Sequence, residues 1–187
     1  MKSRYVIFAL AVSLTLTGRL HAQDDAARKA LAALDRFVGE WTVDGRWSDG
    51  SSLHARGVYE WGLNKRILKA RTYVKDGEKE YQRYESVLAW HPDKKLLFEI
   101  SFAFDGALSE YVVETAGKDT LRIGWTPFAA DKPSRARQVI KFLDKDHFRW
   151  TVSLKEGDGW KQLIEAVWVK GQTRPARAPA SSAPPRP

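Results

Sequence analysis

Hydrophobic and polar residues follow two different periods along the chain. Residues 24–36 place Ala27, Leu31 and Leu34 at helical spacing behind a pair of aspartates, which predicts a short amphipathic helix. After Gly39 the period changes to two, and this alternation predicts a succession of about ten short strands. The expected strands span residues 40–47, 53–61, 66–74, 81–90, 96–104, 108–115, 121–125, 136–143, 148–154 and 160–169.

Turns of hairpin size separate these expected strands. Asp76-Gly77 and Asp105-Gly106 are typical of tight turns, because glycine accepts a positive φ. Short turns favour sequential antiparallel pairing, and closing the sheet into a barrel removes its two exposed edges. We therefore expect an all-β fold, an antiparallel up-and-down β-barrel with a short N-terminal helix. The alternative is a two-sheet sandwich, which needs a long crossing connection such as residues 127–133.

The two ends of the chain differ in composition from its middle. Residues 1–22 combine a basic start, an apolar stretch and a small-residue pattern before Gln23, which predicts a signal peptide and export to a periplasmic or extracellular space. An ordinary N-terminal helix is the alternative. Residues 171–187 are rich in proline, alanine and arginine, so we expect a disordered tail. The domain between them spans residues 23–170, an ordinary size for one domain.

Charge and composition exclude several classes of function. The net charge of +8 at pH 7 arises mainly at the two ends, which carry basic residues and no acidic ones. The middle is nearly neutral, so we expect no nucleic-acid partner. The chain has no cysteine, which excludes disulfides, thiol catalysis, zinc-thiolate sites and a lipid-modified cysteine. No apolar run reaches the ~18 residues of a membrane-spanning helix, so no transmembrane segment is expected after removal of the signal.

Candidate chemistry is sparse. The four histidines show no metal-ligand spacing and no nucleophile or phosphate-loop motif occurs, so we predict no cofactor and no metal site, and assign no catalytic residue. His54 and Glu60 share one phase of their strand, whereas Leu53, Tyr59 and Trp61 share the other. If the first phase faces the interior, the two residues form the acid–base pair of a barrel enzyme. If it faces outward, they belong to a solvated surface.

The start of the domain resembles a known class of barrel. A helix that runs into Gly39-x-Trp41 is similar to the opening of calycin barrels, which include the lipocalins. Residues 24–170 also resemble a bacterial family of calycin-like barrels of unknown function, in which a strand ends in an aromatic residue before a Pro/Asp turn, as at residues 88–93 here. The resemblance implies that Gly39 allows a tight approach of the chain, that Trp41 plugs the barrel floor, and that the protein binds a ligand.

Two related types of barrel carry residues that this chain lacks. Nitrobindin-like haem proteins share the layout and bind iron through a histidine near the end of the barrel sequence. The last expected strand here has no histidine, and His147 lies one strand earlier. Fatty-acid-binding barrels hold a carboxylate with an Arg-x-Tyr pair on the last strand, where this chain has Lys161 and Gln162 instead.

Aromatic residues indicate what the interior holds. The chain has 8 tryptophans, most of them in expected strands, and barrels of more than about eight strands enclose more volume than side chains fill. Small residues at inward phases, such as Ala70, Ser86 and Ala166, add to this space. We therefore predict a monomeric barrel that binds a small, largely apolar molecule. The expected lining is Trp41, Trp61, Tyr84, Leu88, Phe98, Phe102, Trp125 and Trp150, with Arg71 or Arg137 as a polar contact.

A filled barrel is the alternative to a hollow one. In that case large side chains pack the interior, and the protein is an interaction module that recruits a partner through its tail or through its surface.

Overall fold

The structure is a computed structural model that describes residues 25–125 and 136–171, without the side chain of Trp125. The predicted signal peptide, the predicted loop over residues 127–133 and the predicted tail beyond Gly171 lie outside the described residues. An α-helix over residues 25–32 comes first, followed by the 3-10 helix η1 (Asp35–Phe37). The strands are β1 (Gly39–Arg46), β2 (Ser52–Gly62), β3 (Ile67–Asp76), β4 (Lys79–His91), β5 (Leu96–Ala103), β6 (Leu108–Thr115), β7 (Thr120–Trp125), β8 (Ala136–Phe142), β9 (His147–Glu156) and β10 (Gly159–Lys170).

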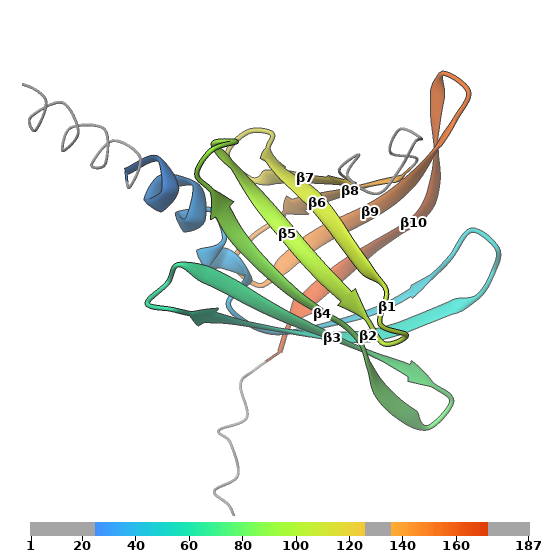
Figure 1. The fold of residues 1–187 in the computed structure, drawn as a ribbon. Coiled ribbons are helices and arrows are strands. Elements are labelled where there is room, and N and C mark those ends of the chain that lie inside the picture. The colour runs from blue at the N-terminus through green and yellow to red at the C-terminus, as the bar shows by residue number, and fades with distance from the viewer. Residues whose placement is uncertain (1–24, 126–135, 172–187) are drawn as a thin grey trace, which may run out of the picture.

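These strands form a closed barrel in which each strand pairs with its neighbour in sequence (Figure 1). Every pairing is antiparallel, and β1 also pairs with β10, with Trp41 opposite Lys170. The predicted all-β, up-and-down barrel with a short N-terminal helix is therefore confirmed, and each strand lies within a few residues of its expected range. A two-sheet sandwich is excluded because the first and last strands are hydrogen-bonded to each other.

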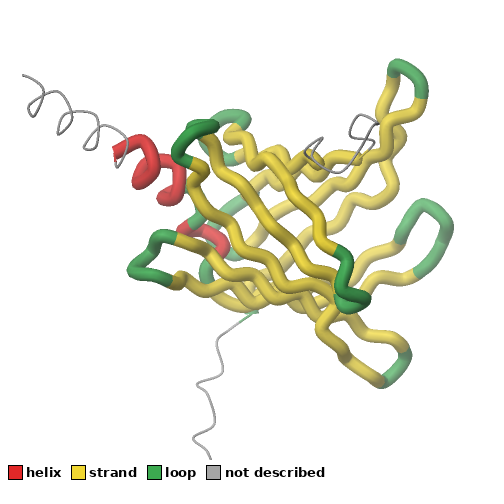
Figure 2. The backbone as a smooth tube through the Cα atoms, in the orientation of Figure 1, coloured by secondary structure: helices red, strands yellow, loops and turns green. Residues whose placement is uncertain are grey.

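The two ends of the barrel are built differently, as Figure 2 shows. The N-terminal helical segment lies across one end, which we call the floor. At the other end, which we call the mouth, the hairpins β1–β2, β3–β4 and β9–β10 extend beyond the body of the barrel. Because the strands alternate in direction, the turns that follow β2, β4, β6 and β8 all lie at the floor end.

Aromatic side chains fill the floor. Trp41 and Leu34 have no exposed surface, and Phe37 and Phe148 are 2% exposed. The Phe148 ring centroid lies 4.7 Å from that of Trp41 and 5.6 Å from that of Phe37. The Trp41 indole nitrogen donates a 2.6 Å hydrogen bond to the Phe37 carbonyl, so its polar atom is satisfied as well. Trp41 therefore plugs the barrel, as the resemblance to calycin barrels implies.

The helical segment differs from the single helix predicted over residues 24–36. Beyond residue 32 the hydrogen bonds span three residues instead of four, with the Leu34 amide bonded to the Leu31 carbonyl at 2.9 Å and the Phe37 amide to the Leu34 carbonyl at 3.0 Å. This tighter winding places the buried Leu34 and Phe37 in the floor core. Burying these two side chains stabilises the tight turn more than two further α-helical hydrogen bonds would.

Polar contacts fasten the helical segment to the floor turns. Arg36 pairs with Asp119 between β6 and β7. Asp35 accepts a 2.9 Å hydrogen bond from the indole nitrogen of Trp61 on β2. These contacts fasten the helical segment to the second strand and to the turn between β6 and β7.

Gly39 makes the approach from η1 into β1 sterically feasible. Its φ is +124°, a value that residues with a side chain rarely adopt, and a Cβ atom there would lie 2.9 Å from Cε of Lys170. The Lys170 ammonium in turn lies 5.2 Å from the centre of the Trp41 ring. The positive φ therefore favours glycine at this position, and a larger residue would also have to displace the end of the Lys170 side chain.

Candidate functional site

A cavity of about 600 Å³ lies inside the barrel above the floor. Phe37 and Phe148 of the floor form its lower boundary, and Trp47 contributes to its wall near the mouth. Ala70 and Ser86, two of the small residues expected to face inward, line it and leave the space that larger side chains would fill. The barrel is therefore hollow over part of its length.

One side of the cavity is aromatic. Tyr59, Trp150 and Trp168 line it from β2, β9 and β10, and the Trp150 and Trp168 ring centroids lie 6.2 Å apart at a steep angle. The Trp150 indole nitrogen donates a 2.7 Å hydrogen bond to the side-chain oxygen of Gln138. This bond fixes the indole plane against the neighbouring strand β8.

The opposite side carries a polar cluster made by β4 and β5. Ser86 and Ser101 are register partners, both are buried, and their hydroxyl oxygens share a hydrogen bond at 2.8 Å. Glu99 lies two positions before Ser101 and lines the same wall. Burial raises the pKa of the Glu99 carboxyl, and a hydrogen bond from Ser86 offsets part of that rise. Burial also raises the pKa of Tyr59, and the Glu99 charge adds to this effect.

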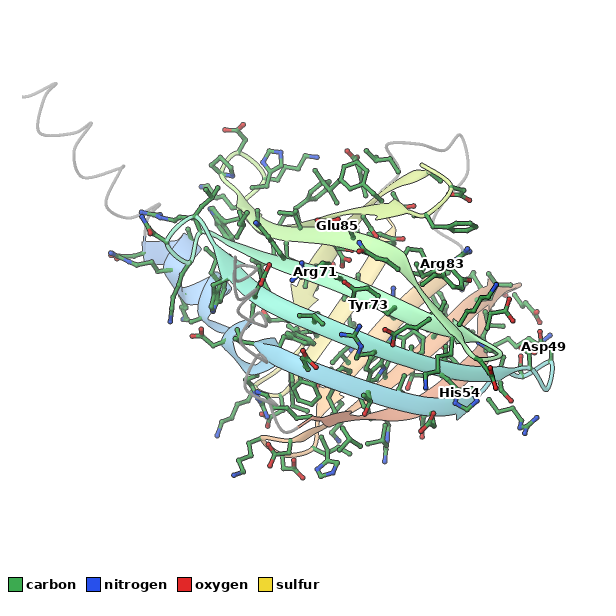
Figure 3. All side chains as sticks on the ribbon, turned by 90° about the horizontal axis from the view of Figure 1, so that it is seen from below. Asp49, His54, Arg71, Tyr73, Arg83 and Glu85 are labelled. Atoms are coloured by element: carbon green, nitrogen blue, oxygen red, sulfur yellow. The ribbon has the colours of Figure 1, made fainter. Side chains whose placement is uncertain are left out.

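A β-bulge shapes the mouth. The register of β3 and β4 shifts between Thr72, which is opposite Tyr84, and Tyr73, which is opposite Gln82, so that Arg83 is the extra residue. Arg83 lines the cavity, and its guanidinium carbon lies 4.4 Å from the centre of the Phe104 ring. A hydrogen bond with Tyr84 raises the pKa of Arg83. Figure 3 shows Arg83 toward the barrel end opposite the helix.

The structure places three of the predicted lining residues on the cavity wall, namely Tyr84, Leu88 and Trp150. Trp41 lies below the cavity in the floor. Trp61 also lies at the floor end, where it is bonded to Asp35, and it does not line the cavity.

Two aromatic residues predicted to line the cavity lie on the outer surface instead. Phe98 and Phe102 alternate with Leu97, Glu99 and Ser101, which face inward, and Phe102 is 47% exposed. Their prediction is wrong because the larger apolar face of β5 points outward.

Both predicted polar contacts also lie outside the barrel. Arg71 pairs with Glu60 at 3.1 Å on the outer face, and its register partner on β4 is Glu85, as Figure 3 shows. The guanidinium carbon of Arg137 lies 4.1 Å from the centre of the Trp160 ring. Gln138, the next residue along β8, lines the cavity, so Arg137 has the outward phase. The predicted roles of Arg71 and Arg137 are therefore wrong.

The acid–base pair considered for a barrel enzyme is not formed. His54 hydrogen-bonds Asp44, its register partner on β1, and both side chains are exposed. Glu60 pairs with Arg71, as described above. The two residues therefore have separate partners: Glu60 lies on the outer face of β2, and the solvent-exposed His54 lies beside the cavity mouth, paired with Asp44.

Sequence reasoning missed the residues that give the cavity its polarity. It assigned no role to Glu99, Ser101 or Arg83, and it treated Ser86 only as a small residue. One signal was present: Glu99 is a single charged residue within the apolar segment 96–102. A charged residue is ordinary on an outward face. Because the face of β5 with Phe98 and Phe102 was assigned to the interior, Glu99 was assigned to the surface and not to the cavity.

Neither a metal-binding cluster nor a membrane-spanning helix is found in the part of the chain that the structure describes. Within residues 25–125 and 136–171, no three or more histidine, aspartate or glutamate residues are grouped to hold a metal ion. Over the same ranges, no helix has the length and the apolar character that crossing a membrane requires.

Fold and cavity together define an up-and-down β-barrel with an internal chamber. No family model matches the chain, and no curated protein matches it. Among solved structures it is similar to the S-type phycobiliprotein lyase CPES from Guillardia theta, at 13% identity over 75% of this chain and 92% of that chain, with a TM-score of 0.47. It is also similar to EF1p2_mFAP2b bound to DFHBI, at 16% identity over 76% of this chain and 99% of that chain, with a TM-score of 0.38.

Proposed function

We propose that this protein binds a small, largely apolar molecule inside its barrel. The observation that carries the proposal is the cavity of about 600 Å³, enclosed by aromatic side chains on one side and by a polar cluster on the other. Cavities of about 300–1,000 Å³ with mostly apolar walls and a few polar groups are typical of small-molecule sites. A filled interaction module would not leave this volume empty.

Export is part of the proposal. The basic start, apolar stretch and small-residue pattern of residues 1–22 support it. The protein would then meet its ligand in a periplasmic or extracellular space, as a single chain carrying one molecule.

Native mass spectrometry of residues 23–187, purified gently from the source cell, tests the proposal. We expect a protein mass of one chain plus a reproducible excess that corresponds to one small molecule. An excess mass equal to haem would overturn the prediction that no cofactor is bound. Only the bare mass, together with no binding of added apolar probes, would favour the filled interaction module.

A pair of variants links the excess mass to the cavity. Ala70→Leu places a larger side chain in the cavity, and we expect it to lose the bound molecule. Ala89→Leu makes the same change on the outer face of β4, opposite Phe98, and should retain it. Equal retention by both variants would show that the molecule binds elsewhere.

A further inference from the structure

The polar groups of the cavity are distributed unequally between its depth and its mouth. Lys75, Asp76 and Arg83 line it from the β3–β4 hairpin at the mouth, and His54 lines it from the mouth end of β2. Glu99 lies deeper in the barrel than Arg83. Tyr84, which follows Arg83, is opposite Ala103 on β5, and Glu99 lies four positions before Ala103, about 13 Å closer to the floor. The inner part of the cavity therefore has an acidic group without a nearby basic one.

Glu99 has few protein partners. In the described ranges it forms no ion pair, and the Ser86 hydroxyl is the one group whose hydrogen bonding lowers its pKa. That hydroxyl is shared with Ser101, so it provides at most one donor to a carboxylate that accepts several. Glu99 is half-buried and lines the cavity, so its carboxylate can pair with a cationic group of a molecule that enters the cavity.

The surroundings of Glu99 favour a cation over other partners. Tyr59, whose phenol is close enough to sense the Glu99 charge, and Tyr111, the register partner of Glu99 on β6, both line the cavity. The faces of aromatic rings attract cations, and the low dielectric of an apolar cavity strengthens attraction to a carboxylate. The same carboxylate repels an anionic group at this depth.

We infer that the ligand is a hydrophobic amine, with a protonated nitrogen that pairs with Glu99 and an apolar body that contacts the aromatic side of the cavity. This inference rests on the proposed function and narrows its ligand to one chemical class. Glu99 is then the residue that selects the ligand, and Ser86 and Ser101 orient its carboxylate.

Three probes with one apolar body test this inference: naphthylmethylamine, naphthylmethanol and naphthoic acid. Their binding to residues 23–187 is measured at neutral pH by isothermal titration calorimetry. For the wild type we expect the amine to bind about 10- to 100-fold more tightly than the alcohol, because a charge-assisted hydrogen bond replaces a neutral one. The acid should bind most weakly.

Variants assign the preference to one side chain. Glu99→Gln keeps the shape of the side chain, and we expect it to bind amine and alcohol with similar affinity. Glu85→Gln removes a carboxylate from the outer face of the adjacent strand β4 and should behave as the wild type. Glu99→Asp keeps the charge but shortens the side chain, and it should retain part of the preference for the amine over the alcohol. Comparing it with Glu99→Gln distinguishes the effect of lost charge from the effect of changed packing.

Proton release gives a measurement that needs no variant. Burial holds the pKa of Glu99 above its ordinary value of 4.5, so in the pH range between 4.5 and the raised pKa, pairing with an amine shifts the carboxyl toward its ionised form and releases protons. Titrations in buffers of different ionisation enthalpy should report this release for the amine and not for the alcohol.

The outcomes distinguish the two proposals. Equal affinity of the wild type for amine and alcohol, or a preference that persists in Glu99→Gln, would overturn the amine inference and leave ligand binding intact. Failure of all three probes to bind the wild type, combined with a bare protein mass from the source cell, would overturn both.

Discussion

The floor and the cavity are built by the same strands and differ in almost every physical property. Trp41 and Phe148 on β1 and β9 belong to a fully buried aromatic cluster. Trp47, which follows β1, and Trp150 on β9 are only partly buried, and both line the cavity. The difference comes from the helical segment, which inserts Leu34 and Phe37 at the floor, whereas no residue within 25–125 and 136–171 makes such an insertion at the mouth.

This comparison indicates how the barrel divides its tasks. The floor concentrates the apolar burial that stabilises the fold, so the cavity can remain unfilled and can carry a charged group. Substitutions at the two ends should therefore have opposite effects: those in the floor should change stability, and those in the cavity should change binding.

The largest effect is expected at Trp41. Replacing it with alanine removes a fully buried indole and should lower the free energy of unfolding by about 3–5 kcal/mol. Trp150→Ala should cost clearly less, because its side chain already faces empty volume. Urea unfolding followed by circular dichroism measures both variants. Equal losses of unfolding free energy in the two variants would contradict the view that the floor stabilises the fold and the cavity does not.

Gly39→Ala should have the next largest effect. Alanine must adopt an unfavourable φ and also displace the Lys170 side chain, so we expect a loss of about 1–3 kcal/mol. Gly50→Ala is the matched control, since Gly50 has φ +91° and no atom within 4 Å of its Cβ position. A loss at Gly39 no greater than the loss at Gly50 would show that the closure over the floor adds no constraint.

Glu99→Gln should change stability in a pH-dependent way. Because the pKa of Glu99 is raised above its ordinary value of 4.5, the folded state holds the proton more tightly than the unfolded state does. The wild type should therefore lose stability as pH rises from 4.5 through the raised pKa, and the Gln variant should not show this loss. Urea midpoints measured across this range test the expectation, with Glu85→Gln as the control; parallel curves for wild type and Glu99→Gln would contradict it.

The smallest effect is expected at Arg71. Its ion pair with Glu60 lies on the outer surface, and such pairs contribute less than about 1 kcal/mol. Arg71→Ala should leave binding of the naphthyl probes unchanged in the same calorimetric titrations. A loss of probe binding would return Arg71 to the role that the sequence first suggested.

Alternation along the chain predicted the strands and the closed barrel because both depend on local period and turn length. It did not predict which face of each strand is internal, since a period of two fits either assignment. Tyr84 and Leu88 on β4 and Phe98 on β5 were all assigned to the interior. In the structure Leu88 is opposite Glu99. Residues with even numbers on β4 therefore face the cavity together with residues with odd numbers on β5, and Phe98 faces outward.

Turn length determines this relation. His91 pairs with Leu96 across a four-residue turn, and an even number of turn residues places even positions opposite odd ones. The bulge at Arg83 reverses the relation within a single hairpin, because it adds one residue to β4 only. No residue type in the sequence marks this bulge, so the position of Arg83 did not follow from the pattern, whereas the inward phase of Glu99 depends on the length of the turn between β4 and β5.

The pairing of β1 with β10 has a consequence for the order of events during folding. All other pairings join strands that are adjacent in sequence, whereas Trp41 and Lys170 come from opposite ends of the domain. Contacts between distant residues form slowly because the intervening chain loses entropy when its ends meet. We expect the hairpins to form first and this seam last, so the chamber would exist only after the final strand has been synthesised, and the ligand would enter a finished barrel.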